Sequence, residues 1–193
     1  MARPPSDRRE RILKAAITCF STQAYPDVKL DQVAEQAGVA KGTIYLYFRT
    51  KDDLFCQCLL DDAPHWISQT EKIIHSAETA AKRLHRMVVL QSKAYQLKGP
   101  LIQSLLQMGP TFPLSTEIIA RLHDHLRQVV ARYASLFQDG LAAGEFSDRF
   151  TATQMAIIFI QIFDLNVKFQ MFQVPLLRPD DVYDALMKLF GPT

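Results

Sequence analysis

A short run of basic, small and hydroxyl residues near the N-terminus is the part of the chain whose chemistry is most readily assigned. Lys41, Gly42 and Thr43 open a segment that ends at Phe48. On a helix, Ile44 and Phe48 share one face, so the first three residues point away from any core that this face covers. Small, basic and hydroxyl groups at the start of a helix suit the major groove of DNA, and its backbone N–H groups favour phosphate.

The element that must position this segment is the helix before it. Leu30, Val33, Ala34 and Ala37 recur at i, i+3, i+4 and i+7, which predicts one apolar stripe on a short helix. Gly38 follows, and glycine adopts the positive φ that a tight turn between two helices usually needs. Helix, glycine turn and second helix together predict a helix-turn-helix.

The stretch from residue 33 to 54 resembles the DNA-binding signature of TetR-family transcriptional regulators. That pattern has isoleucine-alanine, then Ala-Gly-Val-Ser, then Gly-Thr-(Leu/Ile)-Tyr-x-Tyr-Phe and Lys-(Asp/Glu)-(Asp/Glu)-Leu. The corresponding positions here are Val33-Ala34, Ala37 to Ala40, Gly42 to Phe48 and Lys51 to Leu54. The resemblance implies an all-α fold of about nine helices, with a three-helix DNA-binding domain over residues 1–50 and a helical effector-binding and dimerisation domain over 51–193.

Two positions depart from the family pattern. Lys29 and Ala40 stand where Ser or Thr is common, so the hydroxyl caps of both helices are missing. Losing such a cap costs about 1 kcal/mol. Lys29 can still meet phosphate as a point charge, and the residues expected to contact DNA are Lys29, Lys41, Gly42, Thr43, Tyr45, Leu46, Tyr47 and Lys51.

Four of these side chains have more specific expected roles. Tyr45 is next to the buried Ile44 and is expected to be half packed, whereas Tyr47 is expected to expose its hydroxyl to phosphate. Leu46 stands where a polar residue is often found, so it meets either a thymine methyl or nothing. Lys51, at the start of the next helix, is expected to contact the DNA backbone.

Charge is distributed unevenly along the chain. The net charge is only +2, but residues 1–60 hold nine Lys or Arg against seven Asp or Glu, so the whole surplus lies in the predicted DNA-binding part. Four arginines cluster at the start, where the resemblance places an arm near the DNA backbone; a solvated helix face is the alternative. They are Arg3, Arg8, Arg9 and Arg11.

Catalytic and metal-binding patterns are not found in the sequence. The five histidines have no common metal-ligand spacing, and no P-loop, nucleophile elbow or dinucleotide-binding turn occurs. Cys56 and Cys58 lie about 200° apart on a helix, so they cannot share one metal. We therefore expect no enzyme activity, no cofactor and no metal, and three reduced cysteines in a cytoplasmic protein.

Helical periodicity dominates the rest of the chain. A first helix carries the stripe Ile12, Ala15, Ala16, Cys19 and Phe20, and Thr50 with Asp53 predicts a capped helix that Pro64 kinks or ends. Later helices are expected at about 77–97, 100–108, 115–142, 151–173 and 179–190.

The segment from Met155 to Phe163 is apolar except for Gln161, so this helix must be covered on two sides. The last two helices of TetR-like proteins form a four-helix bundle with a second chain, and the resemblance implies the same here. The alternative is a central helix in a monomer core. Residues expected at the dimer contact are Ile158, Ile162, Val182, Leu186, Leu189 and Phe190.

An effector is expected in the C-terminal domain, as in TetR-like proteins, and a small hydrophobic or aromatic compound fits the side chains available. The candidates are Trp66, Met87, Met108, Phe112, Phe159, Phe163 and Asp164, with ordinary core packing as the alternative for the apolar ones. Asp164, an acid in an apolar helix, either orients a polar ligand group or pairs with Lys168.

Together these observations predict a function. We expect a cytoplasmic, ligand-responsive DNA-binding regulator, a repressor that binds a palindromic operator as a homodimer and releases it when a hydrophobic effector binds. The alternative is a helical ligand-binding or adaptor protein that does not bind DNA. No membrane partner is expected, because the sequence has neither a signal peptide nor a long uncharged apolar run.

Overall fold

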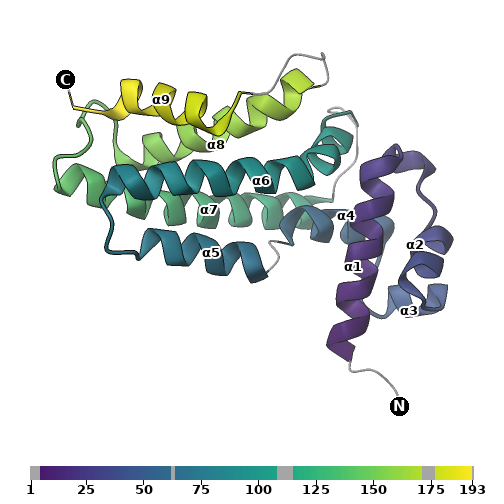
Figure 1. Ribbon diagram of the computed structural model, residues 1–193. Coiled ribbons are helices and arrows are strands. Elements are labelled where there is room, and N and C mark those ends of the chain that lie inside the picture. The colour runs from purple at the N-terminus through teal and green to yellow at the C-terminus, as the bar shows by residue number, and fades with distance from the viewer. Residues whose placement is uncertain (1–4, 62–63, 108–114, 171–176, 193) are drawn as a thin grey trace. The chain divides into compact units, whose positions relative to one another are not determined.

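The computed structural model describes residues 5–61, 64–107, 115–170 and 177–192 (Figure 1). Within them the chain is helical, with no strand, which confirms the all-α prediction. The elements are α1 (Pro5–Thr22), the 3-10 helix η1 (Tyr25–Asp27), α2 (Leu30–Ala37), α3 (Lys41–Tyr45), α4 (Lys51–Leu60), α5 (Pro64–Ile74), α6 (Ala80–Gln107), α7 (Thr116–Ala142), α8 (Ala152–Gln170) and α9 (Pro179–Phe190).

The chain divides into two compact units. We call residues 1–61 with 98–122 the N-terminal unit, and residues 62–97 with 123–193 the C-terminal unit. The long helices α6 and α7 contribute residues to both. The functional division proposed from the sequence, after residue 50, stays a prediction.

The core of the N-terminal unit is built on the predicted stripe of α1. Ile12, Ala16 and Phe20 are fully buried, and α1 packs against both α2 and α4. Phe20, Tyr25 and Phe55 form an aromatic cluster in which ring centroids lie 4.9 to 5.7 Å apart. These contacts fix α2 and α3 beside α1 (Figure 1), which is what positions the helix-turn-helix.

The core of the C-terminal unit is also aromatic. Phe137 of α7 makes edge contacts with Phe159 of α8 and Phe190 of α9, with centroids 6.2 and 5.5 Å apart. Phe159 in turn contacts Phe163 at 5.2 Å. The predicted start of α9 at Pro179 and its end before Gly191 are both confirmed.

Two predictions about helices were wrong. Residues 64–74 form α5, which was not foreseen: α4 ends at Leu60, and Pro64 occupies the first turn of a new helix, where proline is tolerated. The predicted helices at 77–97 and 100–108 are one helix, α6, with Pro100 inside it. An internal proline costs about 3 kcal/mol, and burial of Leu101 in the apolar core offsets part of that cost.

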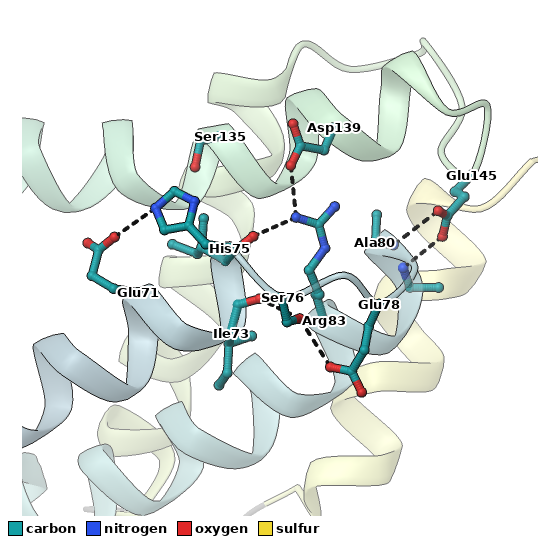
Figure 2. Close-up of polar contacts among 12 residues, drawn as sticks. Glu71, Ile73, His75, Ser76, Glu78, Ala80, Arg83, Ser135, Asp139 and Glu145 are labelled. Carbon is teal, nitrogen blue, oxygen red and sulfur yellow. Dashed lines mark hydrogen bonds and ion pairs between the residues drawn. The ribbon is translucent and has the colours of Figure 1, made fainter.

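Polar contacts join helix ends within the C-terminal unit (Figure 2). Arg83, 7% exposed, donates from Nη1 to the Ile74 carbonyl at 2.6 Å and to Asp139 Oδ2 at 2.8 Å. Both carboxylate oxygens of Glu145 accept from backbone N–H groups at the start of α6, at 3.0 Å each. These bonds satisfy helix-end groups that would otherwise lack partners.

No helix in the described parts of the chain is both long and apolar enough to cross a membrane.

Candidate nucleic-acid interface

The turn between α2 and α3 has the geometry predicted for it. Gly38 adopts φ 63° and ψ 44°, the left-handed region, and its N–H donates to carbonyls in the last turn of α2. Arg11 of α1 donates to the Gly38 carbonyl at 2.9 Å and also to the Ala37 carbonyl. The turn is therefore held from two sides, and Arg11, one of the arginines expected near DNA, stabilises it.

The outward face of α3 is exposed along its length. Ile44 and Phe48 are buried as predicted, which turns the opposite side of the helix to solvent. Leu46 is 81% exposed and Tyr45 is 50% exposed. A Cβ added to Gly42 would meet no atom within 4 Å. This face consequently makes few contacts within the chain and is open to a partner.

The two tyrosines are arranged in the opposite way to the prediction. Tyr45 is exposed, whereas Tyr47 is half-buried and packs against the core of the N-terminal unit. The chain leaves regular helical geometry after Tyr45, and Tyr47 lies three residues after Ile44, which returns it toward the buried side. Tyr45 is therefore the tyrosine with the greater access to solvent.

The starts of α2 and α3 lack side-chain caps, as the sequence predicted. Lys29 and Ala40 make no capping hydrogen bond, although Gln32 Oε1 accepts from the Lys29 N–H at 3.2 Å. Lys41 Nζ donates to Asp31 Oδ2 at 2.8 Å, and both side chains are well exposed. This contact with Asp31 raises the pKa of the Lys41 ammonium. Asp31 thus holds the first charge of α3, a role that the sequence analysis missed.

Lys51, at the first position of α4, is positioned by three neighbours. Its Nζ donates to the Pro26 carbonyl at 3.2 Å and lies 4.4 Å from the centroid of the Tyr25 ring. The Tyr25 hydroxyl donates to the Asp52 carboxylate. Burial lowers the pKa of Lys51, and the charges of Asp52 and Asp27 oppose that effect. The ammonium group is therefore preorganised at the start of α4.

The start of α4 is also bound to the first turns of α7. Thr50 caps α4 by accepting from the Asp53 N–H at 2.9 Å, as predicted. Arg121 donates to Asp53 Oδ1 at 2.6 Å and to Gln57 Oε1 at 2.7 Å. These residues line a polar cavity of about 430 Å³ that also includes Arg9 and Arg49. Nothing in the sequence pattern distinguished Arg121, since its partners are more than sixty residues away.

The N-terminal arginines are used in different ways. The Arg9 guanidinium lies 5.7 Å from the centroid of the Phe48 ring, close to the end of the recognition segment. Arg8 is half-buried. Arg3 lies outside the described residues.

The predicted effector residues fall into three groups. Met87, Phe159 and Phe163 are buried in the core of the C-terminal unit, and Trp66 of α5 is half-buried. Met108 and Phe112 lie outside the described residues, and so do the side chains of Asp164 and Lys168.

The predicted dimer residues also differ in exposure. Val182, Leu186 and Phe190 are buried in the chain's own core, Ile158 and Ile162 are half-buried, and Leu189 is exposed. Ile157 and Leu165 of α8, which were not singled out, are 45% and 46% exposed. The three cysteines are buried and form no disulfide, and within the described residues no group of His, Cys, Asp and Glu is arranged to hold a metal.

A three-helix unit with a left-handed glycine turn and an open, partly basic face on its third helix defines a helix-turn-helix DNA-binding protein. The comparisons with known proteins agree. The family model described as "Bacterial regulatory proteins, tetR family" matches residues 12–58. The chain belongs to the TetR family of transcriptional regulators.

Relatives extend the likeness beyond the helix-turn-helix. The "Fatty acid metabolism regulator protein" of Bacillus subtilis is 24% identical over 138 residues, 72% of this chain and 70% of that protein. The "HTH-type transcriptional repressor KstR" of Mycolicibacterium smegmatis is 30% identical over 135 residues, 69% of this chain and 65% of that protein. Both descriptions are of regulators.

A solved structure shows the same fold. The transcriptional regulator FadR from Bacillus subtilis, in complex with stearoyl-CoA, matches with a TM-score of 0.74 at 19% sequence identity. The match covers 93% of this chain and 96% of that chain.

Proposed function

We propose that this protein is a transcriptional repressor that binds a palindromic operator as a homodimer, through α3 and the starts of α2 and α4, and that a hydrophobic effector releases it. The observation that carries the proposal is the outward face of α3, which has few internal contacts although the helix is anchored by buried Ile44 and Phe48. A rigid helix with an uncommitted face is what major-groove binding requires.

We propose a role for each of the DNA-binding residues. Lys41 and Thr43 contact base edges or phosphate at the start of α3, and Gly42 allows close approach of the backbone. Lys29, Tyr45 and Lys51 contact the DNA backbone. Tyr47 supports them from its half-buried position and contributes less directly than the sequence alone implied.

DNA binding is tested by fluorescence anisotropy with duplexes that cover the region flanking the protein's own gene, at several salt concentrations. We expect sequence-dependent binding whose affinity falls steeply with salt, because cationic side chains displace counterions from phosphates. Thr43→Ala is expected to change which sequence is preferred. A helical adaptor or ligand-binding protein that does not use DNA would show no salt-sensitive, sequence-dependent binding with or without ligand.

The effector that we propose is a long-chain acyl compound, with acyl-CoA as the first candidate. A regulator with the same fold is described in complex with stearoyl-CoA, and a relative is named as a regulator of fatty acid metabolism. Apolar and aromatic side chains of the C-terminal unit, including Met87, Phe159 and Phe163, suit an acyl chain.

The effector is tested by adding stearoyl-CoA, stearate or free CoA to the preformed protein–operator complex. Stearoyl-CoA is expected to dissociate the complex, and free CoA is expected to leave it intact because it lacks the acyl chain. Dissociation by none of the three would contradict an acyl effector. A different hydrophobic or aromatic ligand would then be the next class to test.

Dimerisation is proposed through α8 and α9. Ile157, Gln161 and Leu165 lie at i, i+4 and i+8, so they form one exposed stripe on α8, and Leu189 of α9 is exposed as well. Light scattering should report a dimer that Ile157→Glu weakens, because the substitution would bury a charge.

A protein that acts on genomic DNA would work in the cytoplasm.

A further inference from the structure

The outward face of α3 carries an apolar side chain where base edges would lie. Leu46 is the most exposed of the large hydrophobic side chains in the described residues, at 81%. Leu46 is the C-cap of α3 and keeps right-handed helical dihedrals, φ −71° and ψ −22°. It lies one turn after Gly42, so the two share the side of the helix opposite Ile44 and Phe48. The surface presented there is a glycine next to an aliphatic group.

Nothing within the described structure requires glycine at position 42. Its φ lies outside the left-handed region, and an added Cβ would meet no atom within 4 Å. Glycine is nevertheless among the least favourable residues within a helix. The missing side chain therefore favours close approach of a partner molecule to α3 at Gly42. The same partner would then contact Leu46.

Leu46 can recognise only an apolar group. In the major groove, guanine, adenine and cytosine present donors and acceptors, whereas thymine also presents the C5 methyl. An aliphatic side chain pressed onto a donor or acceptor would leave that polar group without a partner. Lys41, the first residue of α3, is held by Asp31 at 2.8 Å, so its charge lies at the start of the helix and Leu46 at its end.

We infer that Leu46 reads sequence, by packing on the C5 methyl of one thymine in each half of the operator. The inference rests on the proposed function and deepens it, since it names a base and the atom recognised. A methyl group buried in this way is expected to improve binding about fourfold. Two symmetric half-sites would therefore give about fifteenfold.

The test replaces thymine with deoxyuridine, which removes the methyl and keeps every donor and acceptor. The operator is first recovered by selection from a random duplex library with the full-length protein. Each thymine is then replaced in turn, symmetrically in both halves, and affinity is measured for wild type and Leu46→Ala. Leu126→Ala is the matched control, because Leu126 is also an exposed leucine, 51% exposed, but lies on α7.

We expect one symmetric pair of thymines at which deoxyuridine weakens wild-type binding about fifteenfold and Leu46→Ala binding hardly at all. Leu126→Ala should keep the full wild-type sensitivity. Leu46→Ala should unfold at the wild-type temperature, since an 81% exposed side chain contributes little to the core.

Two results would overturn the inference and leave DNA binding intact. One is that deoxyuridine has no effect at any position. The other is that its effect is equally large in Leu46→Ala, which would assign the methyl contact to another residue. Failure to select any preferred sequence would instead contradict the proposed function, and the inference would fall with it.

Discussion

Charged and small residues have opposite surroundings on the outward face of α3 and at the polar helix ends of the C-terminal unit. On α3, Gly42 faces open space and Lys41 pairs with a well-exposed acid. In the C-terminal unit, Gly140 lies against Phe146 and Ala80, and Arg83 is buried between two helix ends. Substitutions in the first region should change DNA binding without unfolding the protein, whereas substitutions in the second should do the reverse.

The largest effect is expected for Gly140→Ala. The new Cβ would overlap the Phe146 ring and would lie 2.9 Å from the Ala80 Cβ. The Phe146 ring and the helices α6 and α7 must therefore shift. Overpacking of this kind costs about 3 kcal/mol of unfolding free energy. Chemical denaturation of the variant measures it, and a gain in stability, as expected of glycine to alanine in an open helix, would contradict the close contact.

Arg83→Met should destabilise the chain by about 2 kcal/mol, because the buried Ile74 carbonyl and Asp139 lose a charge-assisted donor. Arg86→Met is the control, since Arg86 pairs with Glu78 at the surface and such pairs contribute about 0 to 1 kcal/mol. Urea denaturation compares the two. Equal losses of unfolding free energy in Arg83→Met and Arg86→Met would mean that burial of Arg83 has no energetic consequence.

Gly42→Ala is the counterpart of Gly140→Ala on the other region. Its unfolding free energy should stay the same or rise by up to about 1 kcal/mol, because the backbone of the unfolded chain loses freedom. Operator affinity should fall at least about tenfold, because the methyl group would separate the helix from DNA. Unchanged affinity would show that the backbone does not approach DNA at this point.

Lys51→Ala should weaken binding to all sequences about fivefold, since one hydrogen bond to phosphate is lost. The slope of log affinity against log salt should fall by about 1. Anisotropy titrations at several salt concentrations measure both. An unchanged slope would remove Lys51 from the set of phosphate contacts.

Asp31→Asn should have the smallest effect and the opposite sign. Releasing Lys41 from its carboxylate partner should tighten DNA binding about twofold, as expected for a surface ion pair. Weaker binding would instead mean that Asp31 holds the Lys41 ammonium in position to contact DNA. It would contradict the expectation that Asp31 and DNA phosphate compete for that ammonium. The same anisotropy titrations distinguish the two outcomes.

Local patterns predicted the helix-turn-helix well because its determinants are close in sequence. The stripe of α2, the turn at Gly38 and the cap at Thr50 all depend on residues within seven positions of one another. The nine expected helices match the nine α-helices of the described residues only in number. α5 was missed, and two predicted helices are one, since tertiary packing decides whether a proline ends a helix or lies within it.

Contacts between distant residues were not predictable in this way. Arg121 with Asp53, Lys51 with the Tyr25 ring, and Arg83 with Asp139 join residues 26 to 68 positions apart. The relative exposure of Tyr45 and Tyr47 was predicted the wrong way round, because packing of Tyr47 against the core of the N-terminal unit depends on tertiary contacts.

The sequence by itself determined that this is a helical TetR-family regulator and which segment forms its helix-turn-helix, because periodicity, glycine turns and caps act over a few residues. Only the tertiary structure decided how the charges of that segment are used: Arg11 and Lys51 are anchored by other elements, Lys41 is paired, and Leu46 is left exposed. The physical reason is that pairing and burial depend on which surfaces meet in space, and chain order does not specify this.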